Sequence, residues 1–169
     1  MNSIVFKGVV TNGVGQHVEL YVPGRDEISQ APSDWPTVLC KGSLNIQIAA
    51  DGYPPIFKEW GLQDSAKSLD AKRFPCAFEV AQREFGNNKL VPNAEMLHRG
   101  SAQVWRAVLS ANDQNIKCWV LRRYGSGLAK QLELLSDKHL RNEYGLQDGQ
   151  AVVVTFLGSI ADGQTVAGS

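Results

Sequence analysis

Glycine, proline and asparagine divide most of the chain into short segments of β-like sequence. Alternating or β-branched segments cover residues 4–10, 18–22, 44–49, 76–81, 102–109, 116–122, 131–135 and 151–157. Breaks such as the predicted tight turn at Gly86-Asn87-Asn88 lie between them. Many short strands with regular breaks are typical of a small barrel or a sandwich, because each strand must pair with its neighbours to bury its apolar face.

Helical sequence is confined to short stretches. The clearest is 136–145, where Ser136 is a candidate N-cap and Gly145 follows the last helical residue. Residues 50–73 are interrupted by glycine and proline, so we expect an irregular excursion there, with a helical turn near 57–60. The sequence therefore predicts a mainly β fold with one or two short helices.

The size of the chain fits one domain with a single sizeable core, since it has 169 residues. We assign residues 1–158 to that domain and 159–169 to a flexible tail that is nearly free of large apolar residues. Hydrophobic residues make up 43% and charged residues 20%, and no stretch resembles a membrane span or a secretory signal. We expect a cytoplasmic monomer that has no membrane partner.

Charge and cysteine content exclude several classes of protein. Lys plus Arg and Asp plus Glu both total 17, and this balance argues against affinity for nucleic acid. The basic pair Arg122-Arg123 is typical of a solvated face. Three widely spaced cysteines without a partner at zinc-ligand spacing indicate reduced, packed thiols with no catalytic role.

A first candidate site is the run Gly42-Ser43-Leu44-Asn45 at the start of a predicted strand. Ser43 and Asn45 are two residues apart, so in an extended segment their side chains point to one face. Neutral hydroxyl and amide oxygens can supplement phosphate oxygens around Mg²⁺, which brings part of its charge balance from a nucleotide. The alternative is an ordinary turn glycine followed by a strand that happens to carry Ser and Asn.

A second candidate site is the glycine-containing junction formed by Gly8, Gly13 and Gly15. Glycine permits positive φ and close approach of the backbone to a ligand, so a phosphate could lie against these amides. The spacing is neither that of a dinucleotide-binding fingerprint nor that of a P-loop. Taken alone, the junction fits an ordinary hairpin equally well.

The third element begins at Glu133, a carboxylate on a short apolar strand, and continues through Leu140-Arg141 to 146–153. Glu133 either belongs to a site or points to solvent from the polar face of its strand. Arg141 either has a functional partner or only complements the C-terminal end of its helix. These residues alone do not decide between the alternatives.

In order, the three elements resemble the CTP-dependent riboflavin kinases known mainly from archaea. That family's pattern runs Gly-x-Val-x-x-Gly-x-Gly, then Gly-Thr-Leu-Asn, then Glu-x-Ile-x-x-x-x-Leu-Arg and Leu-x-Asp-Gly-Asp-x-Val. The chain has Gly8 to Gly15, then Gly42-Ser43-Leu44-Asn45, then 133–153 at corresponding intervals. The likeness spans residues 4–157, although 50–115 is matched by little more than length and strand character.

This resemblance implies a small closed cradle-loop (RIFT-related) β-barrel that transfers a phosphoryl group from CTP to the 5′-hydroxyl of riboflavin, giving FMN with Mg²⁺ as the cofactor. Its ligands would be CTP and riboflavin or FMN. The implied site residues are Ser43 and Asn45 for the metal, Gly13, Val14, Gly15 and Gly42 for the nucleotide, and Tyr124, Ser126 and Glu133 for riboflavin, with Glu133 also the candidate catalytic residue.

The chain departs from the family pattern at several positions. Ser43 replaces threonine and loses the methyl group that restricts χ1, so we expect weaker metal affinity. The segment 122–126 lacks the family's proline and threonine, and Gln150 replaces the second acid of Asp-Gly-Asp. An alternative function is therefore a catalytically inactive homologue that still binds flavin or nucleotide, and a third is a barrel used for DNA or protein contacts.

Overall fold

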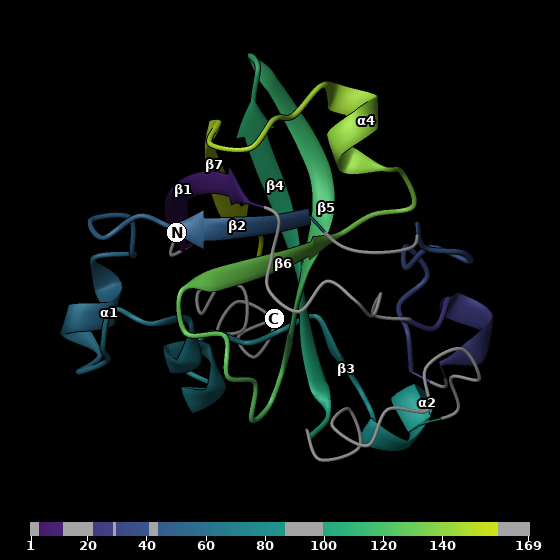
Figure 1. The fold of residues 1–169 in the computed structure, drawn as a ribbon. Helices are drawn as coiled ribbons and strands as arrows, with labels where there is room; N and C mark the ends of the chain where they lie inside the picture. Colours follow the sequence, from purple (N-terminus) through teal and green to yellow (C-terminus); the bar gives the residue numbers. More distant parts are fainter. Residues whose placement is uncertain (1–3, 12–21, 29, 41–43, 87–99, 159–169) are drawn as a thin grey trace, which may run out of the picture.

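The computed structural model describes residues 4–11, 22–28, 30–40, 44–86 and 100–158. Within these ranges the chain forms one antiparallel sheet (Figure 1). Its strands are β1 (Val5–Thr11), β2 (Leu44–Ile48), β3 (Phe78–Val80), β4 (Ala102–Ala111), β5 (Gln114–Arg123), β6 (Gln131–Leu135) and β7 (Ala151–Phe156). The tail that we predicted for 159–169 lies outside the described residues.

The sheet closes on itself into a six-stranded barrel. The strand order is β3-β4-β5-β6-β2-β1-β7, and β7 also pairs with β4. Strand β4 uses 107–110 to meet β7 and 102–104 to meet β3, so β3 extends the same edge beyond the barrel. The predicted mainly β fold with a small closed barrel is confirmed.

Helices in the described residues are short. They are α1 (Ile56–Glu59), α2 (Gln82–Gly86), α4 (Leu140–Tyr144) and the 3-10 helices η1 (Arg25–Glu27) and η2 (Ala66–Ala71). The helical turn expected near 57–60 is present, whereas α2 and η2 were not predicted. No helix in the described ranges has the length and apolar character needed to cross a membrane.

The predicted N-cap at Ser136 is wrong. The imidazole of His139 caps α4 by accepting a hydrogen bond from the Asn142 N–H at 3.2 Å. Ser136 Oγ instead accepts from the Lys138 N–H at 3.0 Å, which forms a turn ahead of the helix. The predicted C-terminus is correct, because Gly145 takes the left-handed conformation with φ 65°.

The barrel interior is filled by alternate residues of each strand. In β2, Leu44, Ile46 and Ile48 are buried, while Asn45 and Gln47 are only half-buried. This alternation places the two polar side chains on the outer face. Strand β1 approaches β2 closely at Gly8, where a Cβ would collide with the Gln47 carbonyl oxygen.

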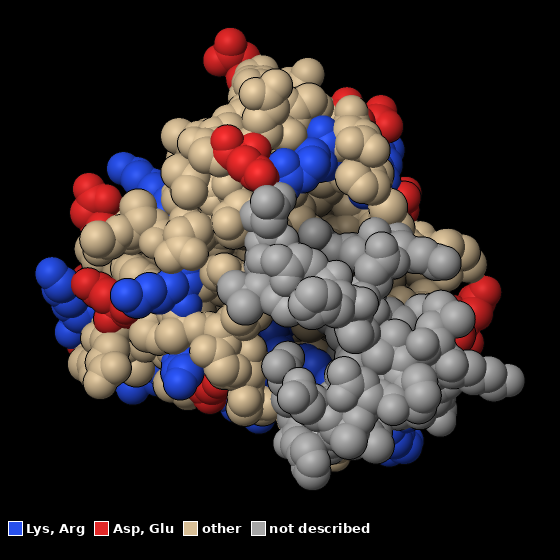
Figure 2. Space-filling model, viewed as in Figure 1, with Lys and Arg blue, Asp and Glu red and all other residues tan. Residues whose placement is uncertain are grey.

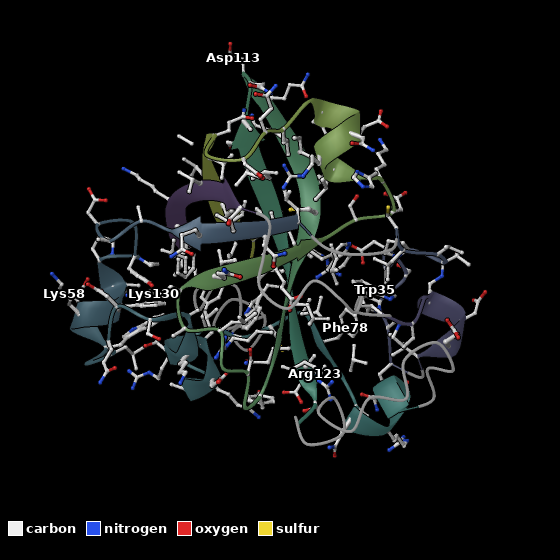
Figure 3. The ribbon with its side chains drawn as sticks, viewed as in Figure 1. Trp35, Lys58, Phe78, Asp113, Arg123 and Lys130 are labelled. Atoms are coloured by element: carbon white, nitrogen blue, oxygen red, sulfur yellow. The ribbon has the colours of Figure 1, made fainter. Side chains whose placement is uncertain are left out.

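A second hydrophobic cluster covers the outside of the barrel, so the expectation of a single core is wrong. Trp35 is fully buried at its centre and makes edge-to-face contacts with Phe78 and Trp119. Its indole N–H donates to the Pro23 carbonyl at 3.0 Å. Figure 3 shows Trp35 and Phe78 on the same side of the molecule, beside β3. Leu121 and Leu135 carry this cluster to the edge of β6.

Candidate functional site

Three adjacent strands place Thr11, Asn45 and Glu133 in one row across the outer face of the barrel. Thr11 is the register partner of Asn45, and Asn45 is the register partner of Glu133. Directly opposed residues of antiparallel strands point to the same side, with Cβ atoms about 5 Å apart. Figure 1 shows β2 and β6 running side by side across the front of the barrel. Each of the three sequence elements therefore contributes one residue to the Thr11–Asn45–Glu133 row.

The row continues into an apolar wall. Leu121 of β5 is the register partner of Glu133, and it is 2% exposed within the outer hydrophobic cluster. Glu133 itself is half-buried on the outer face of β6. A ligand bound along the row would have polar groups at one end and an apolar surface at the other.

The Arg141 and Asp148 segments reach the same end of the barrel. Arg141 Nη1 lies 2.8 Å from Asp148 Oδ1, and Nη2 donates to the Thr11 carbonyl at 3.4 Å. The turn after Asp148 is tied to β1 because the Gly149 N–H donates to the Val10 carbonyl at 2.8 Å. Arg141 thus connects the third sequence element to Thr11, the last residue of β1, which precedes Gly13 and Gly15.

Gln150, which replaces an acid of the family pattern, has a structural task in this chain. Its Oε1 accepts from the Gln147 N–H at 3.1 Å, and its Nε2 donates to Asn112 Oδ1 at 2.8 Å. An amide can both accept and donate, whereas a carboxylate could only accept. Glutamine in place of the second acid is therefore explained by the two hydrogen bonds of Gln150, one within the turn and one to the β4–β5 hairpin.

Several predicted site residues lie outside the described residues. These are Gly13, Val14, Gly15, Gly42 and Ser43. The strand ends that lead to them are described: Thr11 precedes the glycine-containing junction, and Cys40 N–H donates to the Ser136 carbonyl at 2.9 Å shortly before Gly42. The described residues that precede these two segments therefore lie close to the ends of β1 and β6.

The segment predicted to border riboflavin is organised by Arg122. Its guanidinium is 5% exposed and donates to Asp70 Oδ1 and Oδ2 at 3.1 and 3.3 Å. It also donates to the carbonyls of Leu128 and Ser126 at 2.7 and 3.3 Å. Arg122 thus fixes the loop after β5 to η2, and the prediction of a solvated basic pair at 122–123 is wrong.

Ser126 and Glu133, both predicted to bind riboflavin, line one small cavity. The cavity measures about 10 Å³ and lies beside Arg122 and Gln131. Ser126 is 7% exposed, and its Oγ accepts from the Leu128 N–H at 3.2 Å. The structure therefore brings Ser126 to the same side of β6 as the Thr11–Asn45–Glu133 row.

Tyr124, the third residue predicted to bind riboflavin, is directed elsewhere. Its hydroxyl donates to Glu79 Oε2 at 3.2 Å, and Lys72 Nζ lies 5.1 Å from the ring centroid. Burial is the main reason that the pKa of Tyr124 is raised above its ordinary value. Lys72 and Glu79 therefore hold the phenol at β3, and Tyr124 does not line the cavity shared by Ser126 and Glu133.

The donor set of the row suits a metal that arrives with a nucleotide. Within the described ranges, no group of three or more His, Cys, Asp and Glu side chains could hold a metal by itself. Asn45 offers a neutral amide oxygen on the outer face of β2, next to its register partner Glu133. Mg²⁺ accepts such oxygen ligands and commonly takes the rest from phosphates and water. The residues present therefore fit Mg²⁺ bound to a nucleoside triphosphate.

Surface charge on the visible face is mixed. Figure 2 shows Lys and Arg interspersed with Asp and Glu outside the grey region. A groove of about 420 Å³ between Trp35 and β5 carries Arg106, which pairs with Asp34 and stacks on Trp119. These polar contacts join the outer segment 30–40 to the barrel and so have a structural role.

Residues with a structural role near the site were not found from sequence. Asp70 belongs to a segment where no helix was predicted, and only the tertiary structure brings it to Arg122. Gln131 carries no motif signal either, although its position two residues before Glu133 places both side chains on one face.

The chain is similar to the riboflavin kinase of Thermoplasma acidophilum. The two are 28% identical over 153 residues, which cover 90% of this chain. The chain spans 57% of the length of that relative. No protein-family model matches the sequence.

Proposed function

We propose that this protein is a CTP-dependent riboflavin kinase that converts riboflavin to FMN with the help of Mg²⁺. The observation that carries the proposal is the row of Thr11, Asn45 and Glu133, which joins elements that are far apart in the sequence. The similarity to a riboflavin kinase supports the choice of substrate. The preference for CTP rests on the resemblance of the three motifs.

The reaction that fits this site is an in-line transfer of one phosphoryl group. The 5′-oxygen of riboflavin forms a bond to the γ-phosphorus, the bond from that phosphorus to the β,γ-bridging oxygen breaks, and CDP leaves. Phosphoryl transfer of this kind depends mainly on positioning and on neutralising charge. It needs little covalent participation by the protein, which agrees with the few polar groups of the row.

Each residue of the row has a proposed task. Asn45, together with Ser43, would hold Mg²⁺ through neutral oxygens. Mg²⁺, when bound, neutralises charge on the phosphates. Glu133 would orient the 5′-hydroxyl and accept its proton as the bond to phosphorus forms. Asn45 and Glu133 are cross-strand neighbours, so the hydroxyl and the metal-bound phosphate would meet within a few ångströms.

Arg141 would fix the approach of the nucleotide. It holds the Thr11 carbonyl and Asp148, and Thr11 precedes the glycine-containing junction. Gly13, Val14, Gly15 and Gly42 would then surround the triphosphate with backbone N–H groups. The catalytic site would be assembled from the ends of β1, β2 and β6.

The proposal is tested by incubating the purified protein with riboflavin, Mg²⁺ and either CTP, UTP or ATP. We expect FMN to form fastest with CTP and not to form when Mg²⁺ is chelated. Riboflavin binding, seen by quenching of its fluorescence, without FMN from any nucleotide would instead support the inactive homologue. Formation of FMN with ATP alone would refute the nucleotide assignment while leaving the substrate assignment intact.

The metal role of Asn45 is tested by Asn45→Ala. We expect turnover to fall about 10- to 100-fold, the range seen when support for a metal site is lost. Asn115→Ala is the matched control, because Asn115 is exposed on β5 and its side chain accepts a hydrogen bond from the Ser110 hydroxyl at 2.8 Å. Equal losses of turnover and thermal stability in Asn45→Ala would contradict a role in metal binding.

A further inference from the structure

Two pairs of polar side chains lie next to each other on the outer face of β2 and β6. Asn45 is the register partner of Glu133, and Gln47 is the register partner of Gln131. All four side chains are half-buried. The first pair belongs to the proposed phosphoryl-transfer site. The second pair extends the same polar surface by one step along both strands and has no assigned role.

Gln131 has an unmet requirement for a hydrogen bond. Its Oε1 is buried and has no partner within the described part of the chain. Native proteins leave few buried polar atoms in this state, and such an atom commonly marks the place of a water or a ligand. The residue also lines the cavity of about 10 Å³ that Glu133 and Ser126 share, a space on the scale of one water molecule or one donor group.

The surroundings of the cavity restrict the donor that could serve this oxygen. Arg122 lines the cavity, but its guanidinium donates to Asp70 and to two loop carbonyls. Leu121, Leu128 and Val120 supply apolar walls. No carboxylate other than Glu133 lines the cavity, so little negative charge is available there to stabilise a bound cation. A neutral N–H or O–H group is therefore a better donor to the Gln131 amide oxygen, because burying a charge beside apolar walls is costly.

The isoalloxazine ring of riboflavin has such a group. Its pyrimidine ring carries one N–H, at N3, between two carbonyls. An amide side chain can accept from that N–H through its oxygen and donate to a neighbouring carbonyl through its nitrogen. Gln131 and Glu133 are about 6 to 7 Å apart along the strand. One flavin could reach both, because the ribityl chain, attached at N10 of the central ring, can carry the 5′-hydroxyl several ångströms from N3.

We propose that Gln131 is a specificity-determining residue that accepts a hydrogen bond from the N3–H of riboflavin. This inference rests on the proposed function, since it assumes that riboflavin binds beside Glu133. It directs the N3–H of the ring toward the small cavity beside Gln131, and it assigns the ribityl 5′-hydroxyl to Glu133.

The test compares riboflavin with 3-methylriboflavin, in which a methyl group replaces the N3 hydrogen. Affinities are measured by quenching of flavin fluorescence. We expect the wild-type protein to bind riboflavin about tenfold more tightly, the effect of one hydrogen bond. Gln131→Leu should bind both flavins with similar affinity, because it cannot accept from N3–H. Gln131→Glu keeps an acceptor oxygen and should retain the preference.

Two controls separate recognition from folding. Gln114→Leu makes the same chemical change at an exposed position of β5 and should keep the wild-type preference. Gln131→Leu removes a buried acceptor that has no partner, so its melting temperature should not fall below that of the wild type. A clear fall would show that Gln131 has a structural partner and would overturn the inference.

The remaining outcomes also decide the matter. If Gln131→Leu and the wild type show the same preference for riboflavin, an ordered water alone occupies the cavity, and the inference is wrong while the proposed function stands. If the wild type binds neither flavin, both the proposed function and this inference fail.

Discussion

Two Arg–Asp pairs with the same two-point geometry allow burial and contact distance to be compared within one protein. Arg122 and Asp70 interact at 3.1 and 3.3 Å, and their side chains are 5% and 26% exposed. Arg106 and Asp34 are closer, at 2.7 and 2.8 Å, but are 42% and 53% exposed. We predict that Asp70→Asn destabilises the protein more than Asp34→Asn does.

The expected magnitudes follow from what each substitution leaves behind. Removing one partner of a fully buried pair costs about 3–5 kcal/mol, because the other charge stays buried. Asp70 is a quarter exposed, and Arg122 keeps its bonds to Leu128 and Ser126. We therefore expect a loss of about 2 kcal/mol for Asp70→Asn, reduced from that range, and less than about 1 kcal/mol for Asp34→Asn.

Denaturant unfolding of both variants at neutral pH measures these losses directly, and thermal unfolding should show a fall of roughly 4–8 °C for Asp70→Asn. A loss for Asp34→Asn equal to or larger than that for Asp70→Asn would refute the reasoning, since contact distance would then outweigh burial. Asp70→Asn should also raise the KM for riboflavin several-fold with little change in kcat, because Arg122 positions the loop that carries Ser126.

Three further predictions concern other parts of the barrel. Gly8→Ala should destabilise the protein by about 2 kcal/mol or more, because the added Cβ collides with the Gln47 carbonyl oxygen and overpacking strains the strand pair; denaturant unfolding measures it. Burial raises the pKa of Cys118 to about 12, so its thiol should not react with a thiol reagent at neutral pH until the protein unfolds. The hydrogen bond from Arg106 lowers the pKa of Asp34 below 3.8, so this pair stabilises the fold above that pH and the contribution is lost as the pH falls further. The stability difference between wild type and Asp34→Asn should therefore disappear in strong acid.

Strand positions could be predicted most directly where a strand buries every second residue. Strand β2 shows this alternation from Leu44 to Ile48, and β6 and β7 show it closely enough to be located. Closure of the barrel could not be derived from these local patterns. It depends on β7 pairing with β4, two strands far apart in sequence, and it was expected only from the resemblance of the motifs.

The incorrect predictions from sequence arise from contacts that form only in the folded structure. Ser136 has the residue type of an N-cap, but its hydroxyl closes a turn and His139 caps the helix. The 3-10 helix η2 was not predicted, although Ser65 caps it. It is held by contacts with β5 and the loop that follows, including the Arg122–Asp70 pair and a bond from the Ala66 N–H to the Ala129 carbonyl at 2.7 Å. Arg122 looked like a surface charge because its partner lies 52 residues away in sequence.

The candidate site was predictable only in part. Spacing predicted that Ser43 and Asn45 share one face of their strand, and Glu133 was placed on a short strand with its orientation left open. The juxtaposition of Asn45 and Glu133 depends on the pairing of β2 with β6, which spacing does not reveal. Gln131 became a candidate only when its buried oxygen and the cavity around it were known.

The account depends most on the claim that the Thr11–Asn45–Glu133 row supports phosphoryl transfer to riboflavin. Mass spectrometry of a reaction containing the wild-type protein, riboflavin, CTP and Mg²⁺ tests that claim directly. We predict equal amounts of FMN and CDP, and a strongly reduced yield with Asn45→Ala. Unchanged riboflavin and CTP after prolonged incubation with the folded wild-type protein would contradict it.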